Sequence, residues 1–141
     1  MFLSPERCVA SLVSCPHCDA EVVAFAVPSA LREHAPADAA AICTRCLRVV
    51  AADEAGVASE VTADPNLGRV DPAFPSGEAG VALALCCGKL ESFALNRAAI
   101  EALIGHAEGA GADAFAFFDR LEAPDAAFDL DRRRAALHDA I

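Results

Sequence analysis

Two Cys-x-x-Cys pairs constrain the fold of this chain more than any other feature of its sequence. Cys15-Pro16-His17-Cys18 and Cys43-Thr44-Arg45-Cys46 are separated by 24 residues (19–42). Two residues between cysteines allow a tight turn to point both sulfur atoms at one metal ion, while backbone N–H groups of the turn face the sulfurs. Two such turns supply four thiolates in a tetrahedral arrangement, which is typical of structural zinc sites. The sequence therefore predicts that Cys15, Cys18, Cys43 and Cys46 bind one structural Zn²⁺.

The size of the cysteine-containing region makes a metal ion necessary for its stability. A unit of about 40 residues is near the size below which a hydrophobic core needs a metal or disulfides to hold a fold. Structural zinc contributes about 10–16 kcal/mol in small peptides, which is comparable to the stability of a whole domain. Iron is the alternative metal, because rubredoxin-like sites use the same cysteine pairs.

The segments around the cysteines predict short strands, and the rest of the chain predicts helices. Residues 21–27 and 47–50 are rich in β-branched side chains and complete the pattern of a zinc ribbon with two short β-hairpins. The apolar run 81–90 predicts a central buried helix, and three further apolar stripes follow it. The predicted fold is a small α+β protein, with an N-terminal four-cysteine zinc ribbon followed by a C-terminal bundle of about four short α-helices.

Proline and charge divide the chain into parts. X-Pro pairs between residues 53 and 75 disfavour helix, and residues 1–50 carry a net charge of -1 against -9 for residues 51–141. We therefore expect an N-terminal extension (1–13), the zinc ribbon (14–52), a Pro/Gly-containing linker (53–75) and an acidic helical domain (76–141). The candidate helix N-caps are Ser29, Ser76, Asn96, Asp113 and either Asp129 or Asp131.

Composition narrows the setting of the chain. The formal net charge is -10, and Lys89 is its single lysine. This acidity argues against a broad basic face for nucleic acid, and no apolar run is long enough to span a membrane. Residues 1–14 lack the basic start and apolar core of a signal peptide, so we expect a cytoplasmic protein with reduced thiols. Excess carboxylates, scarce lysine and 34 alanines are typical of proteins from salt-loving archaea.

Residues 14–141 resemble an uncharacterised family of small zinc-finger proteins of the CPxCG type from halophilic archaea. The resemblance depends on both cysteine pairs, on the run from Gly77 to Arg97 and on the later helices. It implies a zinc ribbon and a small regulatory or interaction protein, with no assigned task. The chain departs from the pattern after each pair, where Asp19 and Leu47 replace the usual glycine. Asp19 tolerates a left-handed backbone less easily than glycine, and Leu47 is poor in that conformation, so a less regular second turn is expected.

Three functions remain open from the sequence. The favoured one is a non-catalytic structural-zinc protein that acts as a small adaptor or regulator through a protein partner. The alternative is a nucleic-acid-binding zinc ribbon, which a cluster of Arg32, Arg45 and Arg48 would favour. The third is a thiol-disulfide oxidoreductase, because Cys15-Pro16-His17-Cys18 also matches the active-site tetrapeptide of thioredoxin-fold oxidases. A strand pattern after Cys18 and the second cysteine pair argue against it, and no catalytic constellation is found.

The remaining candidate residues have ordinary structural interpretations. His17 is expected to face solvent, and Arg45 and Arg48 to compensate the negative charge of the thiolates. Cys86 and Cys87 are expected in the core and Cys8 to be inert. The triplet 132–134 is expected to form ion pairs on a helix surface. Three phenylalanines are expected to fill the helical core: Phe115, Phe117 and Phe118. Of these, Phe117 is the candidate for an outward-facing side chain.

Overall fold

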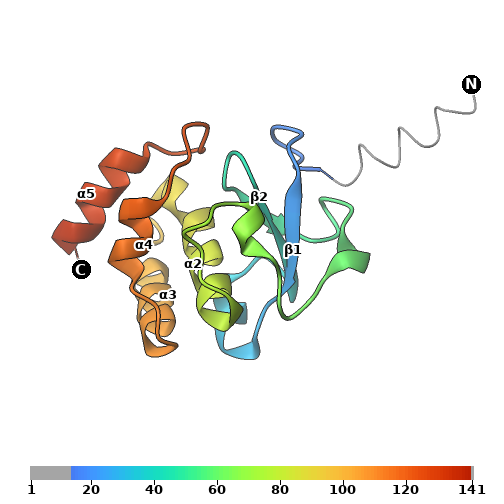
Figure 1. Cartoon of the computed structure of the whole chain (residues 1–141), viewed down its shortest axis with the longest axis horizontal. Coiled ribbons are helices and arrows are strands. Elements are labelled where there is room, and N and C mark those ends of the chain that lie inside the picture. Colours follow the sequence, from blue (N-terminus) through green and yellow to red (C-terminus); the bar gives the residue numbers. More distant parts are fainter. Residues whose placement is uncertain (1–13, 141) are drawn as a thin grey trace, which may run out of the picture.

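A computed structural model describes residues 14–140 as a three-stranded sheet followed by helices, so the predicted fold class is confirmed. The sheet has the order β1-β2-β3 and both neighbouring pairs are antiparallel. Its strands are β1 (Val22–Ala26), β2 (Ala39–Cys43) and β3 (Val49–Ala51). The helices are α2 (Gly77–Lys89), α3 (Arg97–Gly109), α4 (Ala114–Arg120) and α5 (Leu130–Ala140), with short 3₁₀ turns between elements. Figure 1 shows α2 between the sheet and the other helices, with α5 farthest from the sheet.

The two faces of the sheet belong to two different hydrophobic clusters. Val23 and Phe25 of β1 pair with Ile42 and Ala40 of β2, and all four belong to the main core that includes α2. The alternate residues, such as Val22 and its partner Cys43, belong to a second, smaller cluster. That cluster also contains Cys15, Cys46 and part of the 52–57 loop. The predicted metal ligands therefore lie in a hydrophobic layer of their own, on the side of the sheet opposite α2.

The predicted strands are present, and the structure adds one that the sequence does not indicate. Residues 21–27 and 47–50 correspond to β1 and β3, but β2 has the sequence Ala-Ala-Ala-Ile-Cys. Alanine is depleted in strands, so local propensity gives no signal there. Strand β2 lies in the centre of the sheet, so the two predicted hairpins share it.

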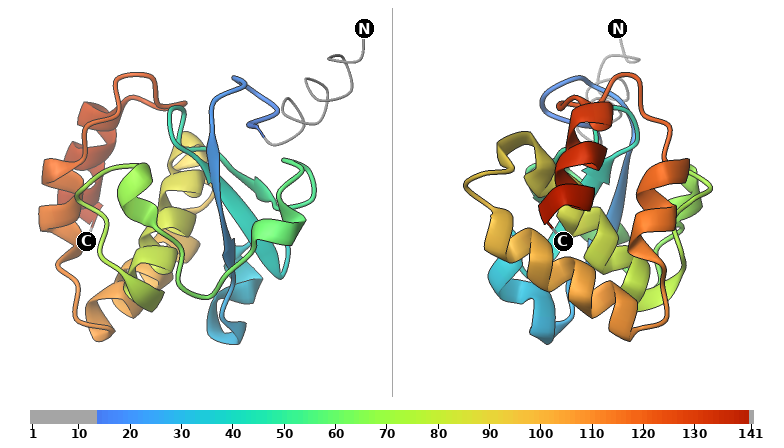
Figure 2. Two further views of the ribbon diagram at one scale, coloured as in Figure 1. Left: turned by 45° about the vertical axis from the view of Figure 1, so that its right-hand side comes forward. Right: turned by 90° about the vertical axis from the view of Figure 1, so that its left-hand side faces the viewer.

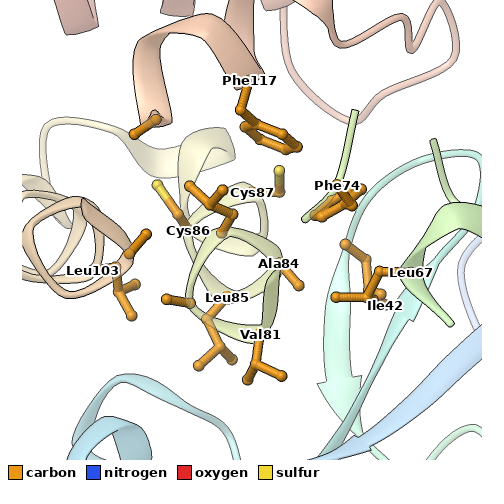
Figure 3. Packing of buried hydrophobic residues seen from close by; sticks show 14 of the residues in the cluster. Ile42, Leu67, Phe74, Val81, Ala84, Leu85, Cys86, Cys87, Leu103 and Phe117 are labelled. Carbon is orange, nitrogen blue, oxygen red and sulfur yellow. The ribbon is translucent and has the colours of Figure 1, made fainter. Parts of the chain in front are cut away.

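Helix α2 forms the centre of the main core, as its apolar sequence predicts. Its side chains from Ala79 to Cys87 are all buried. Figure 3 shows α2 with Leu103 of α3 on one side, Phe117 of α4 above it, and Ile42 and Leu67 on the other side. Cys86 and Cys87 point into this core and are 0% and 1% exposed. Their predicted packing role is confirmed.

The helix N-termini agree only in part with the expected caps. Asp113 accepts a hydrogen bond from the Ala116 N–H (3.0 Å), and Asp129 accepts one from Arg132 (3.2 Å). Ser76 and Asn96 occupy N-cap positions without a side-chain cap bond. The expectation that Ser29 caps a helical turn is wrong, because that turn is capped at Pro28. Ser29 lies inside the turn, since the preceding proline already supplies the extended backbone of the cap.

The phenylalanines of α4 differ from expectation in orientation. Phe117 is buried (3% exposed) and lies 4.7 Å from the ring of Phe74, measured between centroids. Phe115 is the partly exposed one, and its ring lies 5.1 Å from that of His138 in α5. The expectation that Phe117 could face outward is wrong, because segment 67–75 packs against α4 and covers it.

The stretch 53–75, expected to be a linker, packs closely against the protein. Leu67 and Phe74 belong to the main core, and Val57 belongs to the smaller cluster. Asp71 is 8% exposed, and its two carboxylate oxygens accept hydrogen bonds from the backbone of Ala73 (2.8 Å) and Glu122 (3.1 Å). The segment thus connects the sheet with the end of α4. Within residues 14–140, no helix has the length and apolar character needed to cross a membrane.

Gly88 is required where α2 crosses β3. A Cβ atom at this position would lie 2.7 Å from both Cβ and Cγ2 of Val49. Gly88→Ala is therefore expected to lower the free energy of unfolding by about 1–3 kcal/mol. Gly105→Ala in α3 is the matched control, since a Cβ there would meet nothing within 4 Å. The control should stabilise the helix by about 0.5–1 kcal/mol. Chemical denaturation measures both, and equal effects of the two substitutions would contradict the close packing at Gly88.

Candidate metal centre

The structure brings together the four cysteines that the sequence singles out. Cys15 and Cys18 lie in the turn that precedes β1, and Cys43 ends β2, with Cys46 in the turn that leads to β3. The two turns are joined by Thr44, whose backbone N–H and hydroxyl both donate to the Glu21 carbonyl at 2.9 Å. The pairing of Val22 with Cys43 fixes the turns at the same end of the sheet.

The sulfur positions match the ligand set of one tetrahedral metal ion. All four Sγ atoms lie within 4.8 Å of one another. Cys15 and Cys46 have their Sγ atoms 3.8 Å apart, and those of Cys18 and Cys43 are 3.4 Å apart. A tetrahedral ion with metal–sulfur distances of about 2.3 Å separates its ligand atoms by about 3.8 Å. The four cysteines could therefore hold a metal ion, and a full set of four protein ligands would leave no coordination position open.

Backbone N–H groups face the sulfurs, as the spacing of each pair predicts. The His17 N–H donates to Cys15 Sγ at 3.4 Å in the first turn. In the second turn, the N–H groups of Arg45 and Cys46 donate to Cys43 Sγ at 3.3 and 3.4 Å. These donors stabilise negative charge on sulfur, which favours the thiolate form that binds metals.

Both turns keep a left-handed residue after the second cysteine, although neither residue is glycine. Asp19 has φ 65° and Leu47 has φ 63°. The expectation of a less regular second turn is therefore wrong. Side chains with a Cβ pay about 1–2 kcal/mol for this conformation, so the surroundings must impose it. Leu47 is 2% exposed and packs in the main core, which supplies such a constraint.

Burial and hydrogen bonds act on the thiols in opposite directions. Burial raises the pKa of the Cys43 thiol to about 12, although the N–H groups of Cys46 and Arg45 favour its ionised form. Burial also raises the pKa of Cys46. Burial opposes ionisation of Cys18 too, but hydrogen bonds from Ala20 and the neighbouring thiols together lower its pKa. A divalent cation would favour the thiolate at every position, because it supplies the positive charge that these buried groups lack.

The second cysteine turn is attached to distant parts of the chain. The Cys46 carbonyl accepts a hydrogen bond from the Ala127 N–H at 2.8 Å, in the loop between α4 and α5. Arg48 forms an ion pair with Glu91 at 3.3 Å, just after α2. No sequence signal indicates the contact with Ala127. The donor is a backbone N–H, which nearly every residue type has, so the identity of the residue does not reveal it.

Arg32 does not join Arg45 and Arg48 in a basic cluster beside the cysteines. Arg32 follows the opposite end of β1, where it bonds the Val27 carbonyl (3.2 Å) and lies 3.7 Å from Asp38. Arg45 is exposed and forms no ion pair within the described part of the chain. His17 is exposed, as expected. Cys86 and Cys87 lie in the main core, away from the four-cysteine cluster, and Cys8 lies outside the described residues.

The triplet 132–134 binds backbone carbonyls more than carboxylates. Arg133 Nε donates to the Leu90 carbonyl at 2.7 Å. Arg134 forms the expected kind of ion pair with Asp131 (2.8 Å), but its Nε also donates to the Phe118 carbonyl at 2.6 Å. The expectation of surface ion pairing holds for Arg134 alone among the three, within residues 14–140. The ends of α4 and of the turn after α2 offer free carbonyls, and these attract the guanidinium groups.

Metal binding by this site is expected to strengthen as pH rises. Since the pKa of Cys43 is about 12 without metal, this thiol is protonated at neutral pH and must lose its proton to bind. Each proton released raises the apparent affinity about tenfold per pH unit. Competition with a chelator, corrected for the chelator's own protonation, should show tighter binding at about pH 8 than at about pH 6. An affinity that does not change over this range would contradict thiolate ligation.

Comparison with known proteins identifies the family of the chain but no relative of known function. No curated protein and no solved structure matches it. One family model, described as a family of unknown function (DUF6276), matches residues 14–141. The match includes both cysteine turns, the sheet and all four helices described above. The chain belongs to this family of unknown function, DUF6276.

Proposed function

We propose that this protein is a non-catalytic zinc protein that acts as a small adaptor or regulator through a protein partner. The observation that carries the proposal is the set of four cysteine sulfurs within 4.8 Å of one another, three of them on buried residues. A closed thiolate set serves structure, because it leaves no position for water or substrate. The resemblance to small CPxCG-type zinc-finger proteins supports the same role.

Zinc is the metal that this donor set favours. Four thiolates in tetrahedral geometry suit zinc or an iron centre, and zinc is the usual ion of closed structural sites. The ligand layer also contains few large apolar side chains: its members besides cysteine are mainly alanine and valine. Such a layer gains little from apolar burial, so a strongly bound ion has the larger part in holding it together.

Placement of the basic residues favours a protein partner over nucleic acid. Arg32 lies at the end of β1 far from the cysteines, and Arg48 is paired with Glu91. Arg45 alone among these three is exposed without an ion pair in the described chain. Arg45 as the one unpaired arginine among these three, on a protein of net charge -10, neutralises few phosphates near the cysteines.

The alternative of thiol-disulfide exchange receives little support from the surroundings of Cys15. Low-pKa catalytic cysteines lie at a helix N-terminus, whereas the first turn here leads into β1. The short sulfur contacts of Cys15 and Cys18 also reach across to the second turn, to Cys46 and Cys43. This arrangement suits a shared ion better than exchange within one pair.

We also place the protein in a reducing cytoplasm of high salt concentration. The proposal depends on the charge of -10, the single lysine and the free thiols. At roughly 1 M salt, the Debye length is about 3 Å, so repulsion among the carboxylates is screened.

Purified protein is expected to contain about one zinc ion per chain. Cys43→Ser should abolish stoichiometric zinc and unfold the cysteine turns of the ribbon, because it removes a ligand from the centre of the smaller cluster. Cys86→Ala is the matched control, since this thiol lies in the main core and should leave zinc content unchanged. Elemental analysis and circular dichroism measure the two effects. Metal-free protein with a reversible Cys15–Cys18 disulfide would instead support the redox function.

Binding assays at different salt concentrations separate the two leading functions. Nucleic-acid affinity falls with salt at a logarithmic slope near -0.9 per phosphate contact on duplex, whereas apolar burial persists in salt. We expect no binding to random RNA or DNA above about 1 M salt, and capture of a protein partner that survives there. Fluorescence anisotropy measures binding to RNA or DNA, and affinity capture measures binding of the protein partner. Tight RNA binding in molar salt that is lost in Arg45→Ala with Arg48→Ala would contradict the adaptor proposal.

A further inference from the structure

Helix α5 has a weak apolar attachment to the rest of the protein. Leu137 is the one buried side chain among those described in α5. By contrast, nine consecutive residues of α2 are buried. Since apolar burial is the main favourable term in packing a helix, α5 depends on other contacts to stay in place.

Leu130 is partly buried against the core and His138 contacts the Phe115 ring, and the polar contacts of α5 reach two separate parts of the fold. Arg133 donates to the carbonyls of Leu90 (2.7 Å) and Glu91 (3.5 Å), at the end of α2. Arg134 donates to the carbonyls of Phe118 and Leu121, at the end of α4. Polar contacts of this kind are exposed to competition from water, so they hold the helix only while the acceptors keep their positions.

The second cysteine turn contacts the loop before α5 and one of these two acceptor sites. Cys46 accepts a hydrogen bond from Ala127, in the loop that leads directly into α5. Arg48, two residues later, is paired with Glu91, whose carbonyl also accepts from Arg133. Figure 2 shows the loop after α4 extending to the turn between β2 and β3, where Cys46 lies. One cysteine turn therefore contacts the loop before α5 and, through Glu91, the acceptor site that follows α2.

Two parts of the protein act on the conformation of that turn: the main core, which holds Leu47, and the cluster around the cysteines. Leu47 has φ 63°, which an isolated leucine disfavours. When Cys43 and Cys46 bind a shared ion, the ion and the sheet together determine the backbone of residues 43–48. Without the ion, the main core still holds Leu47, but the Cys46 side chain loses its ligand bond, so the Cys46 carbonyl is held opposite Ala127 less firmly.

We propose that occupancy of the metal site controls the docking of α5, so that α5 is bound to the fold in the metal-loaded protein and released when the metal leaves. This inference rests on the metal-binding part of the proposed function. Release would uncover aromatic side chains that α5 now contacts: the Phe115 ring next to His138, and the Phe93 ring, 5.8 Å from the Arg133 guanidinium carbon. The same ion thus stabilises the ribbon and regulates access to an apolar face of the helical part.

Hydrogen–deuterium exchange of the full chain, with zinc bound and after chelation, tests this coupling. Chelation is expected to speed exchange in α5 and in the loop 121–129 by about tenfold or more, while α2 and α3 stay protected. Protection of α5 that does not change on chelation would overturn the proposal. Simultaneous loss of protection in α2, α3 and α5 would also overturn it, because the metal would then hold the whole fold and not α5 in particular.

Two substitutions at Ala127 test the contact itself in zinc-loaded protein. Ala127→Pro removes the N–H that donates to Cys46, whereas Ala127→Ser keeps it. The proline variant should show faster exchange in α5 with full zinc content, and the serine variant should match the unmodified chain. Equal protection of α5 in both variants would overturn the proposal.

Zinc content is measured in every sample before exchange, so the two proposals can fail separately. A chain that binds no zinc contradicts the proposed function. A chain that binds zinc but keeps α5 protected after chelation contradicts the coupling alone.

Discussion

The convergence of four cysteine sulfurs on one side of a small sheet is the constraint on which the rest of the structure depends. Burial raises the pKa of the Cys43 thiol to about 12, and a cation among the four sulfurs would favour its ionised form. The residues around them, mostly alanine and valine, are too small to form a strong core alone. One face of the sheet therefore carries four cysteines that could hold a metal ion, and the other face packs against α2.

The sheet and the helices share one core. Val23, Phe25 and Ile42 pack in the same cluster as the side chains of α2, and Leu67 and Phe74 close it from the connecting segment. Small residues at the contact, above all Gly88 against Val49, let the helix approach the sheet closely. The ribbon in this protein thus has a helical partner on one face and the candidate metal on the other.

The sequence was sufficient for the parts of the structure that depend on local pattern. The spacing of Cys15, Cys18, Cys43 and Cys46 indicated the site, and apolar periodicity indicated the four helices. Strand β2 was not predicted, because its alanine run has no strand propensity. It is a strand because it pairs with β1 on one side and β3 on the other. The burial of Phe117 and the bond from Ala127 to Cys46 also escaped it, since both depend on where distant segments pack.

The left-handed backbone at Asp19 and Leu47 has a consequence for how such turns evolve. In an isolated turn, glycine adopts the left-handed backbone at this position with little cost. The turn itself requires only the positive φ angle, whichever residue supplies it. Once Leu47 is part of the main core, its side chain contributes burial that glycine cannot offer, which compensates for the backbone cost. A motif defined by glycine after the second cysteine would exclude this chain, although its turns retain the geometry that the motif describes.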